Sequence, residues 1–243
     1  SILFAGASIA TDGFEICINS KGNRMLKCPA INENTAKENS SPIESVVKQK
    51  NYTIPNNDGL FDKIIDDYSI PGNDETYYIA MKGNNYGVFD SKFRAIIPFE
   101  YNRIELNRNG EKFLLVNKAG LWGIIGLDGK VTIAPEYTNL QVVKTAEGKE
   151  YVIVQKEGKT FVKDIYNNDV IATGYTRIDY DKDGGFIISN DSNAKGFYFT
   201  DNSVIQPKYK EIKLLAGGKF LKVKTINGKD GFVSKSGEEY FTE

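Results

Sequence analysis

The sequence predicts an all-β protein built from tandem antiparallel β-repeats of about 36 residues. Two observations support this fold class. An aromatic-x-x-aliphatic motif returns with its aromatic at residues 61, 101, 137, 175 and 209, in steps of 40, 36, 38 and 34. Turns rich in glycine and asparagine separate short runs of valine, isoleucine, tyrosine and phenylalanine, which is the composition of short strands joined by tight turns. We expect an open twisted array of sheets, with a small β-propeller as the alternative.

The N-terminal segment, residues 1–30, is expected to form a β-hairpin that resembles a degenerate copy of the repeat. Its apolar residues 2–10 are interpreted as a first strand rather than the remnant of a signal sequence, because a turn and a second apolar run, 14–18, follow. Residues 31–58 are rich in asparagine, serine, lysine and glutamate, and they are predicted to be a polar insertion or linker. The repeat domain is expected to span residues 59–243.

One copy of the repeat shows how four short strands arise. The strands are expected at residues 113–116, 121–125, 131–134 and 140–143. Turns at 117–120 and Asp128-Gly129 connect the first three, and Pro135 ends the ladder because it has no N–H to donate. A sheet of this size cannot bury its apolar face alone, so neighbouring copies must stack on one another.

Aromatic and glycine positions recur in register and are interpreted as structural. Trp122-Gly123 corresponds to Tyr86-Gly87 in the preceding copy, where the aromatic packs between repeats and the glycine permits a close backbone approach. The closing tyrosines are predicted to pack between repeats in the same way; they are Tyr101, Tyr137, Tyr175 and Tyr209. If they emerged on one surface instead, they would form a ladder for a linear polymer such as a glycan.

Several motifs of this copy together resemble a WG repeat, the β-repeat of the bacterial WG-containing (KWG) family. They are Trp122-Gly123, the preceding Lys118-Ala119-Gly120, the turn Asp128-Gly129-Lys130 and the exit Ile133-Ala134-Pro135-Glu136-Tyr137. The resemblance covers roughly residues 60–241. It implies an interaction module or scaffold that is exported or envelope-associated rather than cytoplasmic, and it transfers no catalytic residue.

Other copies depart from the family pattern. Tyr86-Gly87 replaces the tryptophan, Lys195-Gly196 lacks the aromatic, and Thr160-Phe161 lacks both residues. In these copies the spacing of the remaining landmarks supports the assignment.

The composition argues against catalysis and nucleic-acid binding. Lys+Arg 31 nearly balance Asp+Glu 32, so the field of the whole chain attracts neither nucleic acid nor an anionic membrane. Histidine, the commonest general base near neutral pH and the commonest metal ligand, is absent from the sequence. No apolar run is long enough for a transmembrane segment, and no glycine-rich phosphate loop occurs. We therefore expect no enzyme and no cofactor.

The expected function is a non-catalytic repeat module for protein–protein or cell-envelope interaction, with an unidentified protein or envelope polymer as partner. The alternative is a carbohydrate-binding module that uses surface tyrosine and tryptophan, such as an exposed Trp122. A hydrolase with a carboxylate pair ranks third, and a pocket holding two converging acids would favour it.

The segment Asp179–Gly184 matches the opening of a calcium loop, in which Asp179, Asp181 and Asp183 would converge on the ion. The match fails at the later ligand positions. The repeat register also aligns Ile178 with Ile104, so that the three aspartates fall on a hairpin turn. A turn is the favoured interpretation, and no metal site is predicted.

Cys17 and Cys28 are the only cysteines, and they flank a turn near Gly22-Asn23. In a simple hairpin register they would face each other, a geometry that permits a disulfide and would favour an oxidising compartment. Two buried free thiols are an equal alternative.

Two stretches carry an excess of one charge. Residues 208–235 hold eight lysines against two acids, and residues 58–75 hold six acids against one lysine. Both are interpreted as solvated strand faces, since lysine commonly protects sheet edges. The sharper alternative is that the ends of the array attract each other or another copy of the chain.

Overall fold

The computed structural model describes residues 59–110 and 112–241 in full and the backbone of 9–11, 14–18 and 24–25. The chain divides into two compact units, Ser1–Asn51 and Tyr52–Glu243. All regular secondary structure in these described residues is β-strand, and none of them forms a helix able to cross a membrane. The predicted all-β class is confirmed. The predicted linker at 31–58 lies outside the described residues.

The first unit contains a small antiparallel sheet in the order β1 (Ile9–Thr11), β2 (Phe14–Ile18) and β3 (Arg24–Met25). The β2–β3 register pairs Cys17 with Met25. Hairpin register is set by the turn, so the simple register that would place Cys17 opposite Cys28 is wrong for these two strands. Cys28 itself lies outside the described residues, and the disulfide stays a prediction.

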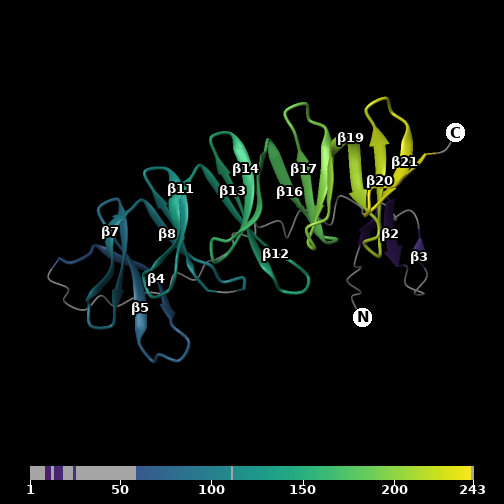
Figure 1. Ribbon diagram of the computed structural model, residues 1–243. Helices are drawn as coiled ribbons and strands as arrows, with labels where there is room; N and C mark the ends of the chain where they lie inside the picture. The colour runs from purple at the N-terminus through teal and green to yellow at the C-terminus, as the bar shows by residue number, and fades with distance from the viewer. Residues whose placement is uncertain (1–8, 12–13, 19–23, 26–58, 111, 242–243) are drawn as a thin grey trace, which may run out of the picture. The chain divides into compact units, whose positions relative to one another are not determined.

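The described part of the second unit, residues 59–110 and 112–241, contains five four-stranded repeats that follow one another in chain order (Figure 1). Repeat 1 contains β4 (Lys63–Ser69), β5 (Thr76–Lys82), β6 (Asn85–Asp90) and β7 (Ala95–Tyr101). Repeat 2 contains β8 (Arg103–Leu106), β9 (Leu114–Lys118), β10 (Leu121–Ile125) and β11 (Val131–Tyr137). Repeat 3 contains β12 (Asn139–Lys144), β13 (Glu150–Lys156), β14 (Lys159–Asp164) and β15 (Asp169–Tyr175). Each of these repeats is one antiparallel sheet.

The last two repeats share one long strand and form a single seven-stranded sheet. Repeat 4 contains β16 (Arg177–Asp181), β17 (Gly185–Ser189), β18 (Lys195–Phe199) and the first half of β19 (Val204–Leu214). Repeat 5 contains the second half of β19, β20 (Phe220–Thr225), β21 (Asp230–Ser234) and β22 (Glu239–Phe241). The register shifts between Tyr209 and Glu211, which is where β19 passes from one repeat to the next.

Apolar cores lie between successive repeats, as the stacking argument requires. Ile79 and Val88 of repeat 1 cluster with Leu114 and Val116 of repeat 2. Three further clusters join repeats 2 and 3, repeats 3 and 4, and the two halves of the seven-stranded sheet. No cluster in residues 59–241 joins repeat 1 to repeat 5, and none of the described sheets is closed. The predicted open array of antiparallel repeats is confirmed.

The register shows which side chains of a repeat face the next repeat. They form a row of three directly paired residues on the second, third and fourth strands. In repeats 1 to 4 the rows are Ile79-Val88-Ile97, Leu115-Ile124-Ile133, Ile153-Val162-Ile171 and Ile187-Phe197-Ile205. Every one of these twelve residues belongs to, or packs against, the core that lies toward the following repeat.

Candidate functional site

In repeats 1 to 4, the position that Tyr86 and Trp122 occupy in their copies lies directly opposite the closing tyrosine. The pairs are Tyr86–Tyr101, Trp122–Tyr137, Thr160–Tyr175 and Lys195–Tyr209. Tyr101, Tyr137 and Tyr209 are buried and lie in the cores between repeats, whereas Tyr175 and Trp122 are half-buried. Because three of the four closing rings are buried, these tyrosines do not form an exposed ladder on which a glycan would stack.

The glycine after the aromatic position permits close contact with the neighbouring strand. A Cβ on Gly123 would lie 2.5 Å from the Ile133 carbonyl oxygen and 2.7 Å from the Pro135 nitrogen. A Cβ on Gly87 would lie 2.9 Å from the Ile97 carbonyl oxygen. The ladder shifts register at both places, so the backbone of the returning strand bulges toward the glycine.

In repeat 3 the glycine and the aromatic residue have exchanged strands. Phe161 stands at the glycine position, and the neighbouring strand provides Gly174 beside the edge of the Phe161 ring. A Cβ on Gly174 would be 3.0 Å from that ring. The missing Trp-Gly pair of this copy is therefore a compensated change rather than a loss of the repeat.

Lysine–glutamate pairs recur beside the closing tyrosines. Lys118 lies 2.9 Å from Glu100 and 5.5 Å from the centre of the Tyr101 ring. Lys156 lies 2.8 Å from Glu136, and burial together with a hydrogen bond to Glu136 raises the pKa of Tyr137 to about 12. Exposed pairs of this kind contribute only about 0–1 kcal/mol each, so they mark a repeated surface feature rather than a source of stability.

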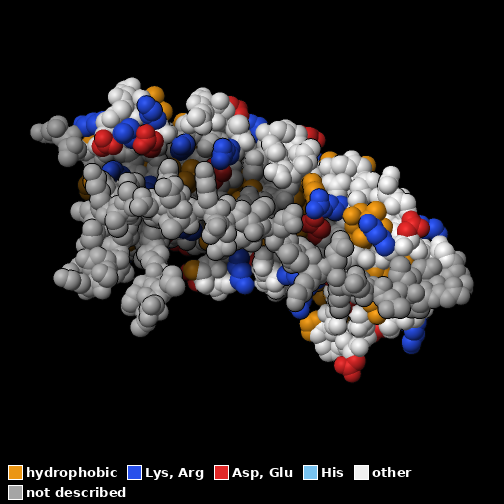
Figure 2. Space-filling view, turned by 180° about the vertical axis from the view of Figure 1, so that it is seen from behind, with side chains coloured by type: hydrophobic (Ala, Val, Ile, Leu, Met, Phe, Trp, Pro, Cys, Tyr) orange, Lys and Arg blue, Asp and Glu red, His pale blue; other side chains and the backbone are white. Residues whose placement is uncertain are grey.

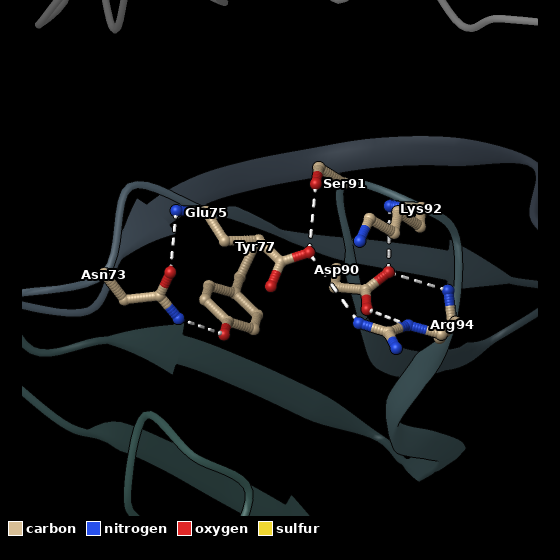
Figure 3. A network of polar contacts seen from close by, with 7 residues as sticks. All are labelled: Asn73, Glu75, Tyr77, Asp90, Ser91, Lys92 and Arg94. Atoms are coloured by element: carbon tan, nitrogen blue, oxygen red, sulfur yellow. Dashed lines mark hydrogen bonds and ion pairs between the residues drawn. The ribbon is translucent and has the colours of Figure 1, made fainter.

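A buried carboxylate organises the turn between β6 and β7 (Figure 3). One oxygen of Asp90 accepts hydrogen bonds from the backbone N–H groups of Lys92 and Arg94, each at 2.9 Å, and the other pairs with Arg94 Nε at 2.6 Å. Ser91 donates to Glu75, which links this turn to the β4–β5 connection. Burial alone would raise the pKa of Asp90, but the hydrogen bonds and the Arg94 charge outweigh it and lower the pKa. The network therefore holds a turn, and Asp90 stays ionised.

Replacing Asp90 with asparagine is expected to destabilise the protein by about 1–3 kcal/mol near neutral pH, because buried N–H groups lose a charged acceptor. Since the folded state lowers the pKa of Asp90, its contribution is present above the unfolded-state pKa and is lost as pH falls through the folded-state value. Urea unfolding across the acid range should show wild type and variant converging at low pH. Asp183→Asn, in an exposed turn, is the matched control, and an equal pH-dependent loss there would contradict this assignment.

The aspartates of the calcium-like segment lie on a hairpin, as the register argument predicts. Asp179 and Asp181 belong to β16, and Asp183 lies in the turn to β17, where its N–H donates to an Asp181 carboxylate oxygen at 2.9 Å. Asp179 pairs with Arg177 at 2.7 Å. Within the described part of the chain, no three Asp, Glu, Cys or His side chains gather as metal ligands would.

A shallow depression lies on repeat 3, between the β12–β13 and β14–β15 turns. Its volume is about 190 Å³, and its lining residues are Gly148, Lys149, Glu150, Asp164, Ile165 and Tyr166. Pockets for small ligands usually have roughly 300–1,000 Å³. The depression is therefore smaller than a usual small-ligand pocket. Tyr166 lies at its rim as one of the most exposed aromatic side chains among residues 59–241.

Two acids, Glu150 and Asp164, line this depression, and Asp164 is held by hydrogen bonds within its own turn. One oxygen of Asp164 accepts N–H groups from Tyr166 and Asn168, and the other accepts the Asn168 side-chain amide at 2.8 Å. Burial acts to raise the pKa of Asp164, yet these hydrogen bonds outweigh it and lower the pKa. Asp164 is thus an ionised turn cap and is poorly suited to donate a proton. Sequence reasoning missed this site, because its residues come from two hairpin turns without a shared motif.

Charged side chains of both signs lie on the described part of the surface. On the side of the molecule that Figure 2 shows, lysine and arginine are interspersed with aspartate and glutamate. Ion pairs link neighbouring repeats, for example Arg108 with Asp66 at 2.6 Å and Lys159 with Asp191 at 2.8 Å. The surface is suited to specific contacts more than to long-range attraction of a polyanion.

Comparison with protein families identifies part of this array. Residues 86–122 and 122–159 each match the model of the WG-containing repeat. The predicted resemblance is confirmed for residues 86–159. No curated protein matches the sequence.

Among solved structures, the chain is similar to Kluyveromyces lactis Hsv2, with 10% identity and a TM-score of 0.32, covering 67% of this chain and 58% of that one. A form of the same protein with loop 6CD replaced by a Gly-Ser linker gives 11% identity and a TM-score of 0.31, covering 70% and 65%. The chain thus spans about three fifths of the length of these propeller proteins. Nothing about function follows from a likeness at this level.

Proposed function

We propose that this chain, whose residues 86–159 are WG-containing repeats, is a non-catalytic module that binds a protein or cell-envelope partner. One observation supports the proposal: apolar cores fill the space between successive sheets. The turns and sheet edges are then the surfaces that remain for contact with a partner. Repeat arrays use their extended lateral surfaces for binding in this way.

The depression on repeat 3 is the surface we assign to the partner. Tyr166 offers an exposed aromatic ring, and Lys149 and the ionised Asp164 offer opposite charges beside it. Aromatic anchors ringed by polar groups are typical of protein interfaces. The small volume and the capping role of Asp164 disfavour the hydrolase alternative.

An affinity capture experiment tests this function. The full chain is immobilised and exposed to envelope and cytosolic fractions of the source organism. We expect a specific partner that wild type retains, that Tyr166→Ser retains at least about tenfold more weakly, and that Lys182→Ala, changed in an exposed turn of repeat 4, retains like wild type.

Failure to retain a specific partner from either fraction would contradict the proposal. Retention on insoluble glycans that depends on Tyr166 would instead favour the carbohydrate-binding alternative. Burial of Tyr101, Tyr137 and Tyr209 disfavours a role for these three closing tyrosines in glycan binding, while Tyr175 is half-buried.

A further inference from the structure

Repeat 5 differs from the other four repeats in the row of side chains that faces onward. The equivalent residues, by the same strand pairing, are Lys222, Phe232 and Tyr240. Val88, Ile124, Val162 and Phe197 occupy the Phe232 position in repeats 1 to 4 and are at most 1% exposed, whereas Phe232 is 44% exposed. Tyr240 is 50% exposed, although its counterparts Ile97, Ile133, Ile171 and Ile205 are at most 5% exposed.

A third aromatic extends this outward face. Phe220 is 42% exposed, and its ring lies 6.1 Å from that of Tyr240 in an edge-on arrangement. Its counterparts in repeats 1 to 3, by the same register, are Tyr77, Phe113 and Tyr151, all of which are buried. We call the outward face of repeat 5, with Phe220, Lys222, Phe232 and Tyr240 at its centre, the end face. It keeps large apolar residues at positions that are core elsewhere.

The charges on the end face are of both signs. Lys224 lies 3.8 Å from both Glu211 and Asp230. Lys213 and Lys222 are paired neighbours across β19 and β20, and no acid of residues 59–241 forms an ion pair with either of them. Both side chains are exposed, and like charges directly opposite each other on neighbouring strands repel. Carboxylates of a partner would relieve this repulsion.

The opposite end of the array is already covered. Ala80 and Phe89 face outward from repeat 1, and both are buried beneath Phe61, whose ring lies 5.6 Å from that of Phe89 and 5.9 Å from that of Phe93. A head-to-tail contact that used this face would have to displace Phe61 to reach Ala80 and Phe89. A two-fold contact uses the same surface of both copies, and the end face is available for it.

We propose that the end face is a homodimer interface, in which the end faces of two copies pack against each other across a two-fold axis. Phe220, Phe232 and Tyr240 of each copy bury one another, and Glu211 and Asp230 of one copy pair with Lys213 and Lys222 of the other. The contact continues the sheet-on-sheet packing already present between repeats. It does not rest on the function proposed for the Tyr166 surface.

The test is the mass of the full-length protein in solution, measured by sedimentation over a roughly hundredfold dilution series. We expect wild type to reach a mass twice that of one chain, and Phe232→Lys to raise the dimer dissociation constant at least about tenfold. Tyr166→Lys, which changes another exposed aromatic on repeat 3, should dimerise like wild type. Thermal unfolding of each variant confirms that it is folded.

Two results would overturn the proposal. One is a wild-type protein that stays monomeric at every concentration, in which case the end face is covered by another part of the chain or by a different molecule. The other is a dimer that Phe232→Lys does not weaken. If Phe232→Lys does not fold, Lys222→Glu provides a second variant, because its side chain is exposed and its reversed charge would face Glu211 and Asp230 of the other copy.

Discussion

Replacement of Phe186 by alanine is expected to lower the free energy of unfolding by about 3–5 kcal/mol. Phe186 has no exposed surface and lies between repeats 3 and 4, with its ring 5.3 Å from Tyr151 and 5.7 Å from Tyr180. The substitution removes a large side chain from the core between the sheets of repeats 3 and 4. The two sheets cannot move together enough to fill the cavity that is left, so most of the packing energy is lost. In thermal unfolding the midpoint should fall by roughly 10 °C.

Tyr166→Ala is the matched control for this core substitution. It also removes an aromatic ring from the second unit, but the ring is largely exposed. Its effect should stay within about 0.5 kcal/mol. Equal losses in the two variants would mean that Phe186 is not part of a packed core.

Replacement of Gly123 by alanine is expected to destabilise the protein by about 1–3 kcal/mol, even though alanine for glycine usually favours the folded state through the unfolded-chain entropy. The added Cβ would meet backbone atoms of Ile133 and Pro135, which cannot rotate away as a side chain can. To relieve this clash, strand β11 must move away from β10. Ile133 of β11 packs in the core between repeats 2 and 3, so the movement would disturb that core.

The control for Gly123 is Gly126→Ala in the following turn. The nearest atom to a Cβ there is a side-chain oxygen of Asp128 at 2.9 Å, which is able to move. Urea unfolding followed by Trp122 fluorescence measures both variants. If Gly126→Ala proved the more harmful, close backbone approach would not be the reason for glycine in the Trp-Gly motif.

Much of the array was predictable because its landmarks are tied to strand register. Ile104 pairs with Val116 in repeat 2, and Ile178 pairs with Ile188 in repeat 4. Ile104 and Ile178 therefore occupy equivalent positions in their repeats, as the aromatic spacing predicted. The same register explains why Asp179, Asp181 and Asp183 lie on a hairpin. Side chains alternate between the two faces of a strand with a period of two residues. Once the strand register is predicted correctly, the residues that face the core are predicted too.

Three features escaped sequence reasoning for physical reasons. The glycine of repeat 3 is displaced onto the neighbouring strand, and the exchange of Phe161 with Gly174 is visible only when the two strands are paired. The surface around Tyr166 depends on two turns coming together. The end face shows the same apolar alternation as the inner repeats, and only the absence of a following core among residues 59–241 distinguishes Phe232 from Phe197.

Amide hydrogen exchange of the full-length protein, resolved by segment, tests the stacking of the five repeats most directly. A continuous stack predicts slow exchange in the inner strands of every repeat, namely β5 and β6, β9 and β10, β13 and β14, β17 and β18, and β20 and β21. It predicts faster exchange in the connecting turns, such as 145–149 and 164–168. Protection confined to one or two repeats, with the inner strands of the others exchanging as fast as the turns, would contradict a continuous stack.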